Sequence, residues 1–292
     1  MIKKFILCIG VYLAVVPQLA ASGDRALFWR VESMQSVVYI FGSIHFADES
    51  FYPLRAEVEQ AFESSDTLVV EVDMSSPEAT ASFQYLIQNE GYYRDGQTLK
   101  DHISEETYTE LLSYLAKMRV PTTLVEKQKP GIVVLTLAAL QAELTGLDPS
   151  MGIDLYFLNN AKKHMKIVSL ETAEQQIRIF LDIKDADLLL RDSFYSLEML
   201  ENEMGILVNA WKLGDEKVIH RLLFDDVLKE NSALAVLYES LYFQRNVTMT
   251  NSIKQFLAKK GQYFVVVGAG HLIGDKGIVR LLQDAGFRIT RQ

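Results

Sequence analysis

Short runs of consecutive apolar residues, separated by longer segments with helical periodicity, constrain the fold of this chain more than any other feature. The runs at residues 67–72, 166–170 and 263–267 are mostly apolar and rich in β-branched side chains. Such runs are typical of strands that are buried on both faces, as in parallel sheets. Because helical segments separate them, we expect an α/β fold with a mainly parallel sheet and helices on both faces.

Further strands are expected near both ends of the chain. Residues 27–32 and 37–41 resemble a hairpin around a polar turn, and residues 287–290 an edge strand. Breaks are expected at Gly205 and Gly214 within the long helical segments. The segments expected to be helical are residues 53–64, 77–89, 104–118, 131–145, 153–164, 173–221, 233–259 and 277–285.

The excess of helix in the middle of the chain predicts a largely helical cap, inserted around residues 75–165 and 173–260. The sequence contains no internal repeat, no low-complexity tract and no Pro/Ser-rich linker that would separate domains. We therefore predict that residues 22–292 form a single domain.

The first 21 residues have the layout of a secretory signal peptide. Lys3 and Lys4 precede a short apolar run, and small residues around Ala21 offer a cleavage site. The run is too short for a stable membrane span. We expect cleavage after Ala21 or Ser22 and a periplasmic or secreted protein of the bacterial cell envelope; an uncleaved anchoring segment is the alternative.

Composition excludes several classes of partner and chemistry. The full chain carries a formal net charge of −9 and has no basic cluster, which argues against nucleic acid and anionic membranes as partners. No second apolar stretch of spanning length follows the signal, so no membrane association is expected after cleavage. The only cysteine, Cys8, lies within the signal, so the mature chain has neither disulfides nor thiolate ligands.

Four polar residues follow four of the expected strands. His45 ends the segment Gly42-Ser43-Ile44-His45, and His271 ends Gly268-Ala269-Gly270-His271. Glu71 and Glu171 each follow an apolar run. Ligands of open parallel sheets bind outside the carboxyl ends of the strands. We therefore expect these four side chains to meet in one crevice.

Two imidazoles and two carboxylates suit a divalent metal ion such as zinc, manganese, cobalt or iron. Such an ion lowers the pKa of bound water towards 7 and supplies hydroxide at neutral pH. One carboxylate could act as a general base instead of as a ligand. We expect Gly42, Gly268 and Gly270 to permit tight turns and close approach of a substrate to the backbone.

Structural roles compete with each of these assignments. A single histidine after a strand is more often a hydrogen-bonded structural residue than a ligand, although the second Gly-x-x-His segment weakens that reading. Glu71 could form a buried ion pair with Arg245, and Glu171 could cap the helix that starts at Thr172. The remaining histidines lie among charged residues on amphipathic helices and are expected to be solvated: His102, His164 and His220.

Several segments together resemble the TraB/GumN family. They occur in the family's order, cover nearly all of the mature chain and are far more specific together than singly. They are residues 41–45 with 52–54, residues 70–73, residues 151–154, residues 170–172 with 174–175, residues 244–246, and residues 267–274.

The resemblance implies a metal-dependent protease, as the related Tiki proteins are described, and a relationship to pheromone-shutdown proteins. It implies a fold related to erythromycin-esterase-like and ChaN-like proteins. The paired Gly-x-x-His segments would be the active-site signature, with Arg245 and Asn246 orienting the site carboxylates. Ser43 stands where many members have threonine, so a hydroxyl is retained.

We therefore expect an exported metal-dependent hydrolase that acts on a peptide or protein. His45, His271 and Glu71 are the expected metal ligands, and Glu171 is the expected base. The rival hypotheses are a non-catalytic protein that binds metal, ligand or peptide, and a metal-free esterase.

Overall fold

The computed structural model describes residues 27–292 except residues 145, 162, 164 and 231. The predicted signal peptide and His164 therefore lie outside the described residues. Among the described residues, no helix combines the length and the apolar character that a membrane span requires.

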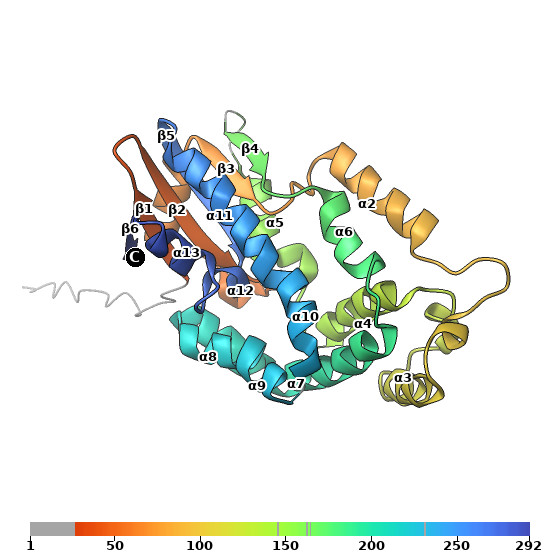
Figure 1. The fold of residues 1–292 in the computed structure, drawn as a ribbon. Coiled ribbons are helices and arrows are strands. Elements are labelled where there is room, and N and C mark those ends of the chain that lie inside the picture. The colour runs from red at the N-terminus through yellow and green to blue at the C-terminus, as the bar shows by residue number, and fades with distance from the viewer. Residues whose placement is uncertain (1–26, 145, 162, 164, 231) are drawn as a thin grey trace, which may run out of the picture.

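Six strands form one mixed sheet in the order β4-β3-β5-β2-β1-β6 (Figure 1). The first four in this order are parallel to one another, and β1 and β6 are antiparallel additions at one edge. The expected α/β class with a mainly parallel sheet is confirmed. The strands are β1 (Phe28–Glu32), β2 (Ser36–Ser43), β3 (Thr67–Val70), β4 (Lys166–Ser169), β5 (Gly261–Gly268) and β6 (Arg288–Arg291).

The register brings the carboxyl ends of the parallel strands together at one edge of the sheet. Ser43 of β2 pairs with Gly268 of β5, and Val70 of β3 pairs with Val266 of β5 and with Ser169 of β4. The polar residues that follow each strand therefore start from neighbouring positions.

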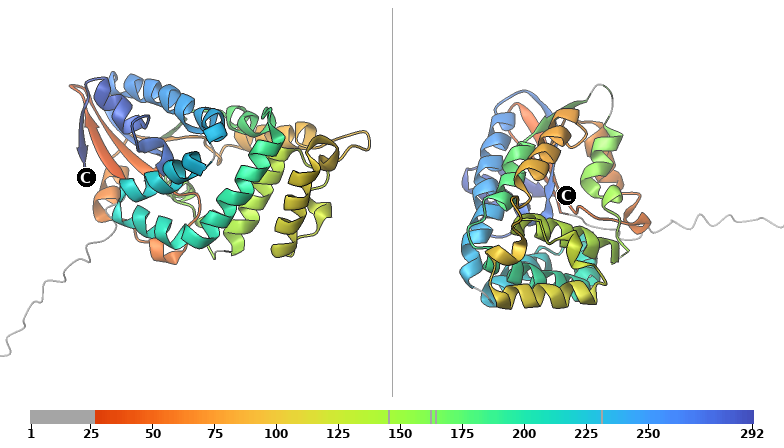
Figure 2. Two further views of the ribbon diagram at one scale, coloured as in Figure 1. Left: turned by 60° about the horizontal axis from the view of Figure 1, so that its bottom comes forward. Right: turned by 90° about the vertical axis from the view of Figure 1, so that its right-hand side faces the viewer.

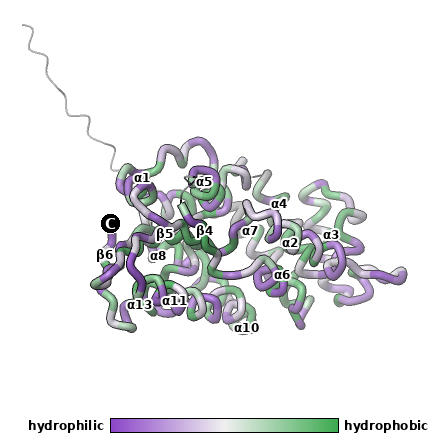
Figure 3. Tube along the Cα trace, turned by 90° about the horizontal axis from the view of Figure 1, so that it is seen from above, coloured by the Kyte–Doolittle hydropathy of each residue, from purple (hydrophilic) through white to green (hydrophobic). Residues whose placement is uncertain are grey.

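Helices cover both faces of the sheet (Figure 3). On one face lie α1 (Ala56–Glu63) and α5 (Ile153–Asn160), whose Phe62 and Phe157 pack against Phe264 of β5. On the other face lie α11 (Gln244–Leu257) and α13 (Ile278–Asp284). The central strands are thus buried on both sides, which explains their continuous apolar sequence.

The expected helical cap lies beyond the carboxyl edge of the sheet, at the end of the molecule away from the C-terminus (Figure 2, left). Its helices pair α2 with α6 and α4 with α7. A second apolar core, which includes Leu111, Val133 and Leu190, holds α3, α4 and α7 together. The cap helices are α2 (Pro77–Glu90), α3 (Glu105–Lys117), α4 (Pro130–Leu144), α6 (Ala173–Leu181) and α7 (Ala186–Leu213).

Shorter helices connect the cap back to the sheet. They are α8 (Glu216–His220), α9 (Asp226–Glu230) and α10 (Ala235–Tyr238), with π-helical turns at Arg221–Asp225 and Glu239–Phe243. One more short helix, α12 (Ala269–Leu272), follows β5 directly. Short π-helical segments are rare and are frequently found at functional sites.

The prediction of helix breaks was wrong at Gly205 and correct at Gly214. Gly205 lies inside α7, where nothing is within 4 Å of the position of a Cβ. A single helical glycine costs only about 1 kcal/mol and does not stop the helix. Gly214 has φ 65 and forms the left-handed end of α7. The break between α6 and α7 instead lies before Asp185, whose carboxylate accepts a hydrogen bond from Leu188 N–H.

Candidate functional site

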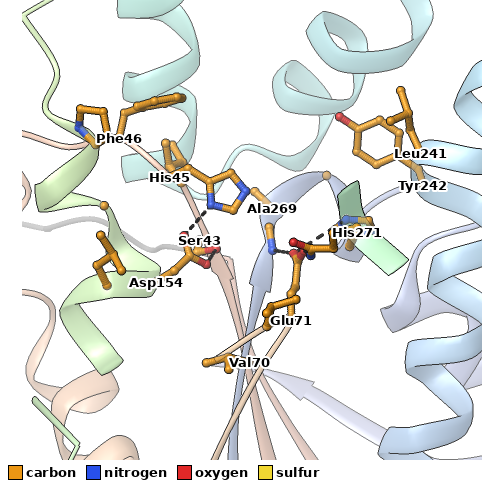
Figure 4. A pocket seen from close by; sticks show the side chains of 18 of the residues that line it. Ser43, His45, Phe46, Val70, Glu71, Asp154, Leu241, Tyr242, Ala269 and His271 are labelled. Atoms are coloured by element: carbon orange, nitrogen blue, oxygen red, sulfur yellow. Dashed lines mark hydrogen bonds and ion pairs between the residues drawn. The ribbon is translucent and has the colours of Figure 1, made fainter. Parts of the chain in front are cut away.

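The structure brings His45, Glu71, Glu171 and His271 to the same carboxyl edge of the sheet (Figure 4 shows three of them). The N–H group of Glu171 donates to the carbonyl of Glu71 at 2.9 Å, so the two carboxylates leave adjacent strands side by side. Gly268 lies between the other groups. A Cβ on Gly268 would be 3.3 Å from Glu71 Oε1, 3.6 Å from His271 Cδ2 and 3.8 Å from His45 Nε2.

Arg245 joins the two carboxylates. Its Nη2 donates to Oε2 of Glu71 at 2.8 Å and to Oε2 of Glu171 at 2.7 Å, and its Nε donates to Oε1 of Glu171 at 2.8 Å. Its Nη1 donates to the carbonyl of Leu241 at 2.8 Å. The guanidinium thus neutralises charge that would otherwise be costly to bury, and fixes both carboxylates in place.

Glu71 is the carboxylate that faces the cavity. Its Oε1 accepts a hydrogen bond from Gly268 N–H at 2.7 Å, and its Oε2 accepts one from Gln176 in addition to that from Arg245. Burial alone would raise the pKa of Glu71, but His271 and the Arg245 guanidinium outweigh it and lower the pKa to about 2. Glu71 is therefore an anion at neutral pH.

His271 is buried and held by Asn246. The structure places it in α12, which follows β5 directly. Asn246 donates from Nδ2 to the carbonyl of Lys276, so its Oδ1 is free to accept from His271 Nδ1 at 2.6 Å. This assigns the proton to Nδ1 and leaves the Nε2 lone pair available, 3.8 Å from Glu71 Oε1. Burial lowers the pKa of His271 to about 4, so the ring is neutral.

His45 is paired with a carboxylate that we did not select from the sequence. Its Nδ1 lies 2.7 Å from Oδ2 of Asp154, and Oδ1 of Asp154 accepts a hydrogen bond from Ser43 at 2.5 Å. The Asp154 carboxylate raises the pKa of His45 to about 9, although burial opposes this. Ser43 contacts the carboxylate and not the ring, so the three residues do not form a nucleophilic triad, in which the hydroxyl meets Nε2.

The docking of α5 on the segment after β2 sets up the Asp154–His45 pair. The N–H group of Ile153 donates to the carbonyl of Ile44 at 3.0 Å. A Cβ on Gly152 would lie 2.4 Å from the carbonyl oxygen of His45, so only glycine permits this approach. The first turn of α5 therefore delivers Asp154 to the imidazole.

These groups form the polar floor of a cavity of about 700 Å³. The cap supplies most of its walls, which are predominantly apolar and include Leu155, Phe180, Met204, Leu207, Trp211 and Leu241. A cavity of this size, apolar with a few convergent polar groups, is typical of small-molecule and catalytic sites.

The donor chemistry of this floor fits a divalent metal ion. The Nε2 lone pair of neutral His271, the Nε2 of His45 once that ring has lost its proton, and a carboxylate oxygen of Glu71 suit zinc and its neighbours. Each ring has its other nitrogen fixed by an acceptor, as ligating histidines do. In the part of the chain that the structure describes, no three His, Cys, Asp or Glu side chains are already arranged around one point as ligands. The His45 side chain, held by Asp154 at Nδ1, is 64% exposed, so a ligand can reach its ring.

Glu171 and Asn246 lie behind the residues that line the cavity. Glu171 accepts from Arg245 and from Gln176, and its side chain is 7% exposed. Thr172, not Glu171, caps α6, through a hydrogen bond from Gln175 N–H. Arg245 and Asn246 orient Glu71 and His271, respectively.

The expectation that the glycines form tight turns was wrong for two of them. Gly42 and Ser43 lie within β2, and a Cβ on Gly42 would be 2.8 Å from Cβ of Leu27. Gly270 lies in α12, where a Cβ would be 2.9 Å from Cε1 of Tyr242. Both glycines permit close packing. Of these glycines, only Gly268 lies beside Glu71, His271 and His45. It is therefore the position at which a substrate could approach the backbone closely.

Sequence reasoning missed Asp154, Gln176 and Tyr242 as site residues. Asp154 lies within residues 151–154, one of the segments that resemble the family, but it is not among the site residues expected from the sequence. Gln176 donates to both Glu71 and Glu171, and Tyr242 packs on His271 with ring centroids 5.3 Å apart. The spacing of Tyr242, Arg245 and Asn246 on one helical face was the available signal. His102 and His220 do not line the cavity.

The chain is similar to one family of known proteins. The model of the TraB/PrgY/gumN family matches residues 27–291. YbaP of Escherichia coli strain K12, an uncharacterised protein, is 28% identical over 251 residues, covering 84% of this chain and 87% of YbaP. An uncharacterised protein of Treponema pallidum strain Nichols is 19% identical over 301 residues, covering 94% of this chain and 85% of that protein. No solved structure matches the chain significantly.

Proposed function

This chain belongs to the TraB/PrgY/gumN family, and we propose that it is an exported hydrolase that cleaves peptide bonds with a divalent metal ion held by His45, His271 and Glu71. The observation that carries the proposal is the grouping around Gly268. Two imidazoles from different strand ends and an ionised carboxylate lie beside the same glycine, at the floor of an apolar cavity.

A divalent ion in such a site lowers the pKa of water and polarises a carbonyl group, which are the two requirements of amide hydrolysis at neutral pH. The residues of the chain prepare the site for it. Asn246 holds His271 so that Nε2 faces Glu71, and Asp154 holds His45 by Nδ1. Arg245 keeps Glu71 ionised and oriented.

Glu171, which the sequence suggests as the general base, has a different role in this proposal. Both of its oxygens accept hydrogen bonds from Arg245, and one also accepts from Gln176. A general base must reach the proton that it removes, and Glu171 does not line the cavity. We assign Glu171 to holding Arg245, which in turn positions Glu71.

A peptide is the substrate class that suits the cavity. Its apolar walls can receive a side chain while the polar floor faces the backbone carbonyl. The acidic chain offers no basic surface cluster for nucleic acid. We further propose that residues 1–21 direct export and are removed, so that the mature protein begins at Ser22 or Gly23 in the periplasm or outside the cell; mass spectrometry of the cellular protein tests this.

The proposal is tested by hydrolysis of peptide and ester libraries before and after metal removal. We expect peptide cleavage that is lost on complete chelation and restored by Zn²⁺, Mn²⁺, Co²⁺ or Fe²⁺. Activity that survives complete metal removal would contradict metal dependence.

One observation favours a second candidate, a metal-free esterase. The Asp154–His45 pair has the geometry of a carboxylate that orients a histidine for proton transfer. Chelator-resistant ester hydrolysis that His45→Ala abolishes would select this candidate. Bound metal with no turnover of any substrate would instead select a binding protein.

A further inference from the structure

Tyr242 lies in the π-helical turn that leads into α11, and it shares one face of this helix with the site residues Arg245 and Asn246. The turn spans Glu239–Phe243 and continues directly into α11. Residues three and four positions apart on a helix lie on the same side. The segment that positions Glu71 and His271 therefore also presents Tyr242 to the site.

The ring of Tyr242 is fixed by its neighbours. It packs against the His271 ring with centroids 5.3 Å apart and against Phe224 with centroids 5.0 Å apart. Gly270 allows this approach, because a Cβ there would lie 2.9 Å from Cε1 of Tyr242. A ring held on three sides carries its hydroxyl in a defined direction.

That hydroxyl points into the cavity, towards the side on which His45 lies (Figure 4). Among the described residues, no hydrogen-bond partner of the Tyr242 hydroxyl is found. Tyr52 and Tyr156, which do not line the cavity, donate to Met151 O and to Glu59. Tyr242 is partly buried and lines the cavity, so its hydroxyl, which has no partner among the described residues, is available to a substrate.

We propose that Tyr242 is a catalytic residue of the hydrolysis proposed above, whose hydroxyl donates a hydrogen bond to the oxygen of the scissile carbonyl. Water adds to the carbonyl carbon and releases a proton to the surrounding solvent, a C–O bond forms, and the π electron pair moves to the carbonyl oxygen. Tyr242 stabilises the resulting negative charge and keeps its own proton, because burial raises the pKa of its phenol above the ordinary value and the phenol is neutral at physiological pH. The C=O bond then re-forms, the C–N bond breaks, and the departing amine takes the proton that the water gave up.

The test compares Tyr242→Phe with Tyr238→Phe in the full mature protein. Tyr238 lies four positions earlier, contacts the Tyr242 ring with centroids 5.6 Å apart, and does not line the cavity. Both substitutions keep the ring and remove only the hydroxyl. We expect Tyr242→Phe to lower kcat about 100-fold to 1,000-fold with little change in KM, and Tyr238→Phe to leave kcat unchanged.

Inhibitor binding gives a readout that does not depend on turnover. A phosphonamidate peptide mimics the tetrahedral intermediate, and the same peptide with a reduced, non-cleavable bond mimics only the ground state. Tyr242→Phe should weaken binding of the phosphonamidate by the same factor by which it lowers kcat/KM. Binding of the reduced peptide should be unchanged. Equal melting temperatures of the two variants show that the ring packing is intact.

Two results overturn the inference and are distinguishable from each other. If wild type hydrolyses peptides and Tyr242→Phe does so at the same rate, the role of Tyr242 is wrong while the proposed hydrolase stands. If wild type neither hydrolyses peptides nor binds the phosphonamidate, the proposed function fails and the inference fails with it.

Discussion

Arg245 donates from Nη2 to Oε2 of Glu71 at 2.8 Å, across 174 positions of sequence. The same nitrogen reaches Oε2 of Glu171 at 2.7 Å, so one guanidinium from α11 joins the carboxyl ends of β3 and β4. The three side chains are 16%, 11% and 7% exposed. Their charges are thus largely removed from water, and each depends on the others.

Replacing Arg245 by Gln should destabilise the protein strongly. Breaking a buried ion pair on one side typically costs about 3–5 kcal/mol, because the remaining charge is left uncompensated. The free energy of unfolding from urea titration measures this. The matched control is Arg178→Gln, which removes the exposed pair with Glu90 and should change the free energy far less. Equal effects of the two substitutions would contradict the buried role of Arg245.

The depressed pKa of Glu71 predicts how stability responds to acid. Its pKa falls from 4.5 to about 2 in the folded protein, so its ionised form stabilises the fold above pH 4.5. That contribution should be lost as the pH falls from 4.5 through 2. Urea titrations of metal-free protein at a series of pH values measure how steeply the free energy of unfolding falls with pH. Glu71→Gln should flatten this dependence, and an unchanged slope would contradict the assignment.

His45 should titrate far above its ordinary range in the metal-free protein. Asp154 raises its pKa from 6.5 to about 9, and Asp154→Asn should return it towards 6.5. Because the folded pKa is the higher one, the pair stabilises the fold below pH 6.5 and loses this effect as the pH rises through 9. The gain is modest, since the His45 side chain is 64% exposed.

NMR titration of the imidazole resonances checks this directly. A pKa of His45 near 6.5 in wild type would show that the Asp154 contact does not persist in solution.

Asn246 should control the metal affinity of His271 without touching the ion. Residues that hydrogen-bond the far ring nitrogen of a ligating histidine typically contribute about 10-fold to 100-fold in metal affinity. Asn246→Ala should lower the metal affinity by such a factor. It should also lower the free energy of unfolding by about 1–3 kcal/mol, because the Lys276 carbonyl and His271 Nδ1 lose their hydrogen-bond partner. Asn160→Ala, on the exposed end of α5, is the matched control. Metal titrations monitored by calorimetry give both affinities.

The strand-end residues could be predicted from sequence because the signal is local. The apolar runs predict the strands, although β4, at the edge of the sheet, is only partly buried and not buried on both faces as expected. The rule that the carboxyl ends of parallel strands meet at one edge then brings His45, Glu71, Glu171 and His271 together. The sheet order, including the antiparallel position of β6, depends on contacts between distant segments, and no local pattern encodes it.

The residues that orient the site could not be predicted in the same way. Asp154 and Gln176 lie on α5 and α6, and they reach the floor only because these helices dock against the sheet edge. Docking follows from the packing of whole faces, such as Phe157 on Phe264, which local periodicity does not reveal. For the same reason the sequence suggests a turn at Gly42, where the structure shows close packing. The Leu27 side chain, which leaves no room for a Cβ at Gly42, directly precedes β1 and comes from the neighbouring strand.

The metal content of the purified mature protein tests the central claim most directly. Elemental analysis should find close to one divalent ion per wild-type chain and per His102→Ala chain. It should find none in His45→Ala and none in His271→Ala, with peptide hydrolysis lost in parallel. Wild-type protein that contains no metal and binds none on titration, or histidine variants that retain both the ion and the activity, would contradict the account.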